Sequence, residues 1–104
     1  RIVHQERAAR LKECFLDAGL PVMDSDSHIV PVFVGDPVAC KKISDLLMEN
    51  YSIYVQPINY PTVQRGRERL RFTPTPLHSN EDIDTLVLAM QEVWFRLNLK
   101  LKKP

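Results

Sequence analysis

Four arginines stand at every second position, 65, 67, 69 and 71, within the segment QRGRERLRFTPTP. A guanidinium group presents a planar fork of N–H donors, which matches a carboxylate or a phosphate bidentately. This spacing makes the segment the first candidate for a binding site, and the expected ligand is an anion. The kind of anion depends on the elements that hold the four side chains.

The expected secondary structure divides these arginines into two groups. The residue pattern predicts a strand over 69–73, in which successive side chains point to opposite faces. Arg69 and Arg71 then share one face, whereas Leu70 and Phe72 share the other and point into a core. Only part of the arginine segment is therefore expected to point in one common direction.

Arg71 is the arginine whose direction is best fixed. It lies in mid-strand just before the Thr-Pro-Thr-Pro exit at 73–76, and proline restricts the backbone at and before its own position. We predict that Arg71 binds an anion, with a solvated strand face as the alternative. Arg65 and Arg67 fall in a loop and are expected to be surface charges, and Arg69 stays undecided.

The composition argues against a polyanionic partner. The net charge is only +1, so no overall basic field attracts nucleic acid or an anionic membrane. Only Phe72 interrupts the arginine segment as an aromatic residue, and it belongs to the opposite face. No apolar run approaches the ~20 residues that a membrane span needs. We expect neither nucleic acid nor a membrane as a partner.

Motifs that would make the chain an enzyme by itself are missing. The chain has three glycines and neither a glycine-rich phosphate loop nor a GxSxG motif. Cys14 and Cys40 lack CxxC spacing and are expected to be reduced thiols, and the histidines lack metal-ligand spacing. We expect no catalytic, cofactor-binding or metal-binding residue here, and a chain that contributes to a site without completing it.

Hydrophobic periodicity predicts three helices and three strands. Helices are expected at 6–18, 37–50 and 79–97, and strands at 28–34, 53–58 and 69–73. Proline at position 31 places its strand at a sheet edge or at a bulge. The fold class is therefore α/β (α+β): one domain over 1–104, with a small, largely antiparallel three-stranded sheet covered by helices on one face.

Three strings resemble the C-terminal part of the 5-aminolevulinate synthases, which belong to the α-oxoamine synthase family of pyridoxal 5′-phosphate enzymes. They are SHIVPV at 27–32, IYVQPINYPTV at 53–63 and RLRFTPTPLH at 69–78. The similarity extends over nearly the whole chain, with matching spacing between the strings. The resemblance implies the small C-terminal domain of a fold-type I enzyme, whose large domain, absent from 1–104, carries the Schiff-base lysine and most contacts to the cofactor.

The 5-aminolevulinate synthases catalyse the condensation of glycine with succinyl-CoA, which yields 5-aminolevulinate, CoA and carbon dioxide. This reaction is the entry step of one route to haem, and the resemblance implies it for the enzyme to which this domain belongs. The resemblance implies a homodimer, located in the bacterial cytoplasm or the mitochondrial matrix. Arg71 matches the arginine that binds the carboxylate of glycine. Thr62 matches a threonine near the acyl end of succinyl-CoA, although a hydroxyl that bonds local turn backbone is the alternative.

Two departures accompany the resemblance. Gln64 replaces the usual proline of PTVPRG, which is expected to loosen this loop. No lysine stands in the Schiff-base motif of the family, so 1–104 alone is expected to be inactive. Two alternatives stay open: the same domain of an α-oxoamine synthase that uses another acyl-CoA, and a non-catalytic structural or dimer-interaction domain.

Overall fold

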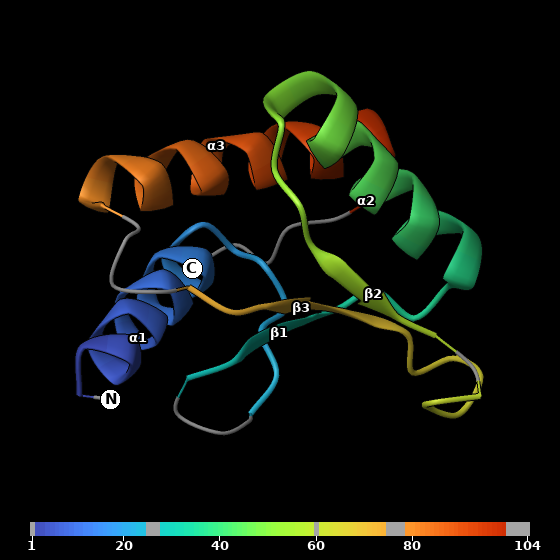
Figure 1. The fold of residues 1–104 in the computed structure, drawn as a ribbon. Coiled ribbons are helices and arrows are strands. Elements are labelled where there is room, and N and C mark those ends of the chain that lie inside the picture. Colours follow the sequence, from blue (N-terminus) through green and yellow to red (C-terminus); the bar gives the residue numbers. More distant parts are fainter. Residues whose placement is uncertain (1, 25–27, 60, 75–78, 100–104) are drawn as a thin grey trace.

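The computed structural model describes residues 2–24, 28–59, 61–74 and 79–99. Helices and strands follow one another in the order helix, strand, helix, strand, strand, helix, as predicted (Figure 1). They are α1 (Ile2–Asp17), β1 (Val30–Phe33), α2 (Pro37–Tyr51), β2 (Gln56–Ile58), β3 (Arg69–Phe72) and α3 (Asn80–Arg96). None of these helices is long and apolar enough to cross a membrane.

The three strands form one antiparallel sheet in the order β1-β3-β2, with the arginine-bearing strand β3 at its centre. Arg71 lies opposite Pro31 of β1 and opposite Gln56 of β2. A central strand is held by hydrogen bonds on both sides, so the directions of its side chains are well defined. The largely antiparallel sheet predicted from the sequence is confirmed.

Pro31 lies on an edge strand, as its missing N–H requires. The outer side of β1 is not left bare, because the chain after α1 runs beside it. The N–H of Met23 donates to the carbonyl of Pro31 at 2.8 Å, and that of Phe33 donates to the carbonyl of Pro21 at 2.9 Å. Pro31 therefore turns its nitrogen away from β3 and costs the sheet no internal hydrogen bond.

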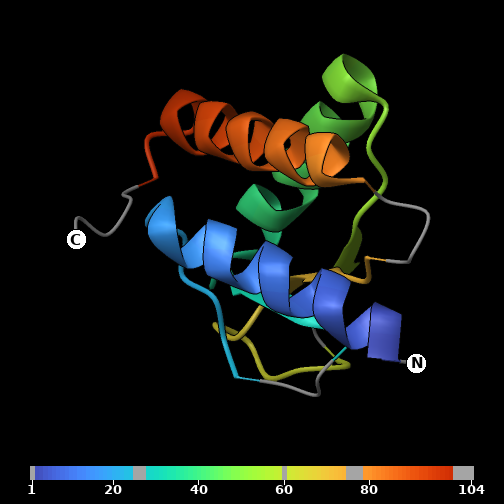
Figure 2. The same ribbon diagram turned by 90° about the vertical axis from the view of Figure 1, so that its left-hand side faces the viewer.

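All three helices lie on one side of the sheet (Figures 1 and 2). α1 and α2 contact the strands, and α3 packs against both helices. Phe15 of α1 meets Phe72 of β3 edge to face, with ring centroids 5.1 Å apart. The helix-covered face of the sheet is thus the wall of the hydrophobic core, and the face away from the helices is called the open face below.

Local signals place the ends of α2 and α3. Asp36 caps α2 by accepting the N–H of Ala39 at 2.8 Å, and Pro37 occupies the first turn. Ser79 and Asp82 form a reciprocal capping box at the start of α3, at 3.1 and 3.0 Å. Both caps are local features, because each joins residues three positions apart in the sequence.

Most element boundaries lie within two residues of the predictions, and the starts of α1 and β2 differ by more. α1 begins at residue 2 instead of residue 6, so its helical backbone starts one turn earlier. β2 covers 56–58 instead of 53–58, because the N–H of Ile53 still closes the end of α2 on the carbonyl of Leu47. The strand can pair only after that cap is complete. The tail 100–104 lies outside the described residues.

Candidate binding site on the open face

A basin of about 390 Å³ opens on the face of the sheet away from the helices. Residues of all three strands and of the loop after β2 line it, and they include Gln56, Thr62, Arg69 and Arg71. Its volume lies in the range of small-molecule sites. Two residues that the sequence singled out, Arg71 and Thr62, therefore meet at one place in the fold.

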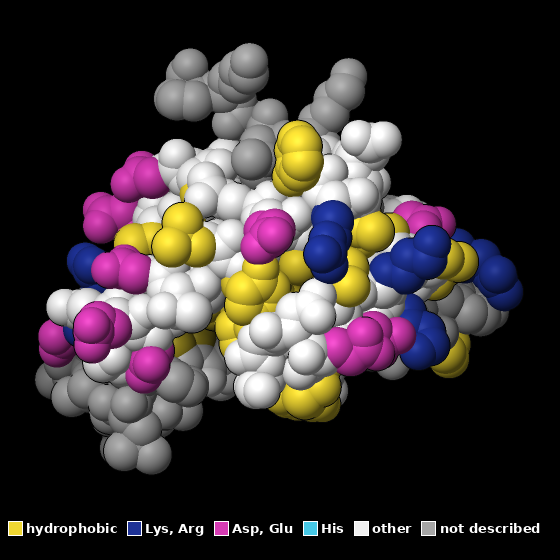
Figure 3. Space-filling view, turned by 90° about the horizontal axis from the view of Figure 1, so that it is seen from above, with side chains coloured by type: hydrophobic (Ala, Val, Ile, Leu, Met, Phe, Trp, Pro, Cys, Tyr) yellow, Lys and Arg dark blue, Asp and Glu magenta, His cyan; other side chains and the backbone are white. Residues whose placement is uncertain are grey.

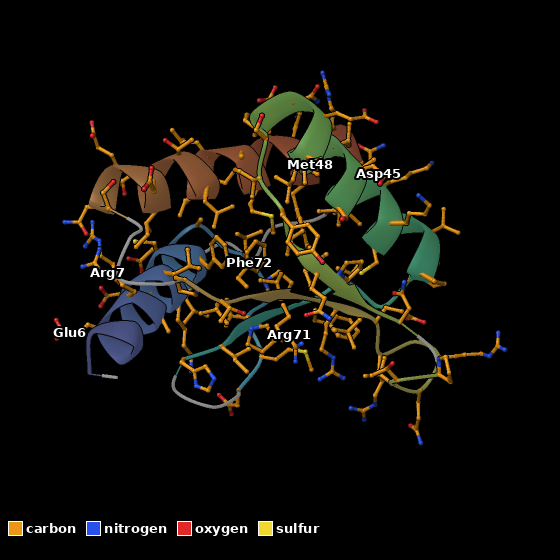
Figure 4. All side chains as sticks on the ribbon, viewed as in Figure 1. Glu6, Arg7, Asp45, Met48, Arg71 and Phe72 are labelled. Carbon is orange, nitrogen blue, oxygen red and sulfur yellow. The ribbon has the colours of Figure 1, made fainter. Side chains whose placement is uncertain are left out.

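Arg71 points into this basin while its neighbour Phe72 points into the core, as Figure 4 shows. The burial pattern of β3 alternates, with Leu70 and Phe72 buried and Arg71 exposed. The predicted division of the strand into two faces is confirmed. What holds Arg71 is a contact that the sequence did not reveal: both its Nε and its Nη2 donate to Oε1 of Gln56, at 3.2 and 2.6 Å.

The charge of Arg71 has no carboxylate partner among the described residues, whose ion pairs all involve other side chains. Asp24 lies at the same basin, but its carboxylate pairs with Nζ of Lys12 at 3.9 Å. Gln56 is neutral, so its amide orients the guanidinium without cancelling the charge. The guanidinium of Arg71 is therefore a cationic group in the basin that an incoming carboxylate can pair with.

The other arginines are held differently. Nε of Arg69 donates to the backbone carbonyl of Arg67 at 3.1 Å, which turns this side chain toward its own chain. Arg69 still lines the basin and is half-buried, whereas Arg65 and Arg67 are exposed in the loop. The expectation of surface positions for the two loop arginines is confirmed.

Thr62 lies in the turn that follows β2. Its backbone N–H closes the turn on the carbonyl of Asn59 at 2.9 Å, so the local hydrogen bond comes from the backbone. Thr62 is exposed and lines the basin with Arg71. Its neighbour Tyr60, which the IYVQPINYPTV string contains, lies outside the described residues, as do Thr75 and Pro76 of the proline-rich exit.

The loop between the turn and β3 is closed by Gly66. The N–H of Arg67 donates to the carbonyl of Gln64 at 3.0 Å, and Gly66 at the third position has a φ of 87°. This geometry is that of a type II turn, in which the third residue requires a positive φ. Gln64 stands first in the turn, where the family proline is replaced, and its side chain is exposed.

Glu68 is a buried carboxylate that the sequence reasoning missed. Its side chain is 0% exposed, and its Oε1 accepts the N–H of Gly66 at 3.0 Å, while Oε2 has no partner. Glu68 lies two positions before Leu70, and alternate residues of a strand point to the same face. If the predicted strand had begun one residue earlier, at position 68, the alternation would have placed Glu68 on the helix-covered side. Its hydrogen bond fixes the loop beside the basin.

The cysteines lie away from the basin lining. Cys40 is fully buried in α2, and its thiol approaches the backbone carbonyl of Arg69 at 3.4 Å. Burial raises the pKa of the Cys40 thiol to about 11, and the charges of Glu68 and Asp36 act in the same direction. Cys14 is half-buried, and both thiols are free, as predicted. Within the described part of the chain, no cluster of His, Cys, Asp or Glu could hold a metal.

The outer surface of the helices differs from the basin. Seen from the helix side, acidic, basic and hydrophobic side chains are interspersed, with acidic groups gathered toward the left of the view (Figure 3). None of the lysines that the structure describes lines the basin, and the ammonium group of Lys41 pairs with Asp45 of the same helix at 3.0 Å. The described lining of the open face therefore presents guanidinium groups, which suit an anion, and no described lysine that could form a Schiff base there.

Comparison with known proteins agrees with the resemblance in the sequence. The family model "Aminotransferase class I and II" matches residues 1–90. The 5-aminolevulinate synthase of Bradyrhizobium diazoefficiens is 59% identical over 100 residues, which cover 96% of this chain and 24% of that protein. 5-Aminolevulinate synthase 1 of Cereibacter sphaeroides is 60% identical over 91 residues, covering 88% of this chain and 22% of the relative. The chain thus spans about a quarter of the length of these relatives.

A solved structure shares the fold. Serine palmitoyltransferase of Sphingomonas wittichii superposes with a TM-score of 0.83 at 19% identity, over 94% of this chain and 25% of that protein. The structural likeness and the match of the family model each extend over most of the chain. The chain belongs to the class I and II aminotransferase family.

Proposed function

We propose that this chain is the C-terminal small domain of a 5-aminolevulinate synthase, and that Arg71 binds the carboxylate of glycine. The observation that carries the proposal is the guanidinium of Arg71, which lies in the basin without an ion-pair partner among the described residues. The identity of 59% to a relative of that name supports this choice within the family.

The role of Arg71 in this reaction is to orient the substrate. When the large domain supplies pyridoxal 5′-phosphate, the cofactor provides the electron sink for bond cleavage at the Cα of glycine. Arg71 holds the glycine carboxylate in one direction, which fixes how the Cα substituents lie against the cofactor plane.

Thr62 is proposed to contact the acyl end of succinyl-CoA. It lines the same basin as Arg71, and its backbone already closes the turn, so its hydroxyl is not required for that hydrogen bond. A hydroxyl can donate to the second carboxylate of a succinyl group. This arrangement would bring the two substrates together at one wall of the shared site.

The remaining parts of the proposal concern the whole enzyme. The whole enzyme is a homodimer that condenses glycine with succinyl-CoA, a step in haem biosynthesis. It is located in the bacterial cytoplasm or the mitochondrial matrix. The large domain supplies the Schiff-base lysine and most of the cofactor contacts. The isolated chain is accordingly inactive, because no lysine among its described residues lines the basin.

A domain exchange tests this function. This chain replaces the matching quarter of the Bradyrhizobium diazoefficiens enzyme, which is 59% identical over that length. We expect the chimera to bind pyridoxal phosphate and to form 5-aminolevulinate from glycine and succinyl-CoA. The unmodified enzyme serves as the control for folding, cofactor absorbance and rate.

Three outcomes would contradict the proposal. A folded chimera with bound cofactor that makes no product would favour a domain whose role is structural. A strong preference for another acyl-CoA over succinyl-CoA would favour a different α-oxoamine synthase. An aldimine that forms on one specific lysine of the isolated chain with pyridoxal phosphate would contradict the assignment of the Schiff-base lysine to the large domain.

A further inference from the structure

We infer that Gln56 is a positioning residue for Arg71, and that it determines which edge of the guanidinium binds the substrate carboxylate. The inference rests on the proposed function of Arg71 and adds a second residue to it. Gln56 would touch neither the cofactor nor the reacting atoms, and its effect on the substrate would pass through the arginine.

The contact between the two side chains is built into the sheet. Gln56 and Arg71 are direct partners in the antiparallel pairing of β2 with β3, so both side chains lie on the open face. A single oxygen of Gln56, Oε1, receives hydrogen bonds from Nε at 3.2 Å and Nη2 at 2.6 Å. Cross-strand neighbours at this separation interact wherever the register holds them opposite each other.

This contact uses one specific edge of the guanidinium. A carboxylate can bind the side edge, formed by Nε and Nη2, or the end edge, formed by Nη1 and Nη2. Gln56 already occupies the side edge, so the end edge remains for the ligand. The amide therefore selects the approach of the substrate as well as the direction of the arginine.

The neutrality of Gln56 matters as much as its position. A glutamate in its place would keep the shape and the acceptor oxygen but would add a negative charge beside the guanidinium. The resulting internal ion pair would compete with the substrate carboxylate for Arg71. An aliphatic residue would remove the acceptor and leave the long arginine side chain free to sample other rotamers before binding.

The chain offers variants that separate these effects. In the chimeric enzyme, Gln56→Glu is expected to raise the glycine KM by roughly tenfold or more, because an ionised acceptor strengthens the internal contact. Gln56→Leu should raise it by roughly threefold to tenfold through lost orientation. The kcat and the KM for succinyl-CoA should change by less than about twofold for both variants, since Gln56 acts on the glycine carboxylate alone.

A matched control places the same charge change elsewhere. Gln64 is exposed in the loop and does not line the basin, so Gln64→Glu should leave the glycine KM within about twofold. Arg71→Leu gives the reference effect, and Gln56→Glu on that background should add nothing, because the amide acts through the arginine. Cofactor absorbance and thermal midpoints confirm that each variant is folded.

The outcomes separate the inference from the function on which it rests. A raised glycine KM in Arg71→Leu together with unchanged KM values in both Gln56 variants would overturn the role of Gln56 and leave that of Arg71 intact. An unchanged KM in Arg71→Leu would overturn both. Equal effects of Gln56→Glu with and without Arg71 would show that Gln56 does not act through the arginine, and would also overturn the inference.

Discussion

The two faces of strand β3 differ in burial and in polarity. Toward the helices, Leu70 is fully buried and Phe72 packs edge to face on Phe15. Away from them, Arg71 reaches into an open basin and is held by Gln56. Four residues of one strand thus supply a core wall and a candidate binding surface at the same time.

This difference shows how a small domain can carry a site without disturbing its core. Side chains that alternate along a strand are separated by the sheet itself, so a change on one face leaves the packing of the other intact. The exception is Glu68, which is polar on the covered side and is buried with one unpartnered oxygen. Its position at the end of the strand links the core to the loop beside the basin.

The largest expected effect comes from shortening a buried side chain on the helix-covered face of β3. Leu70→Ala removes a fully buried side chain from the centre of the sheet and should lower the free energy of unfolding by roughly 2–5 kcal/mol. Urea unfolding of the chain, followed by the fluorescence of buried Trp94, measures the change. Arg67→Ala is the control and should stay within about 0.5 kcal/mol. Equal losses in the two variants would remove the distinction between core and surface.

A chemical probe sharpens the same distinction. The Cys40 thiol has a pKa of about 11 in place of 9.0, so at pH 8 its thiolate fraction is about a hundredfold lower than that of an ordinary thiol. Because it is also fully buried, we expect iodoacetamide to label half-buried Cys14 first. Mass spectrometry of the labelled chain gives the order. Labelling of Cys40 at a comparable rate without urea would mean that the covered face opens readily.

The smallest effect is expected in the loop beside the open face. Gly66 has a φ of 87°, and a Cβ added there would meet nothing within 4 Å. Gly66→Ala should therefore cost about 1 kcal/mol of stability through backbone strain alone. Urea unfolding of the chain measures this cost. A loss as large as that of Leu70→Ala would show that the loop is packed as tightly as the core.

Much of the fold was predictable because its signals are local. Helix periods, the Asp36 cap, the Ser79 capping box and the alternation of β3 all depend on residues within a few positions of one another. The edge position of Pro31 followed from its missing N–H. These features need no knowledge of which strands pair.

The candidate site was only half predictable for the complementary reason. Alternation and resemblance found Arg71 and Thr62, but the partner of Arg71 depends on a pairing between residues 15 positions apart. Pairing register is set by the whole sheet, and no local pattern marks Gln56. The sequence alone points to the proline-rich exit as the feature that fixes the direction of Arg71. In the structure, Arg71 donates hydrogen bonds to Oε1 of Gln56 on the neighbouring strand β2, and this contact holds its side chain.

The most direct test measures the effect of one substitution on two properties, the glycine kinetics that depend on the open face and the stability that depends on the helix-covered face. Arg71→Leu should lower kcat/KM for glycine in the chimeric enzyme, mainly by raising the glycine KM. The decrease should correspond to a loss of roughly 2–4 kcal/mol of transition-state stabilisation. The same variant should keep the unfolding free energy of the chain within about 0.5 kcal/mol, and Arg67→Leu should change neither quantity. Unchanged glycine kinetics in Arg71→Leu, or a loss of stability comparable to that of Leu70→Ala, would contradict the account.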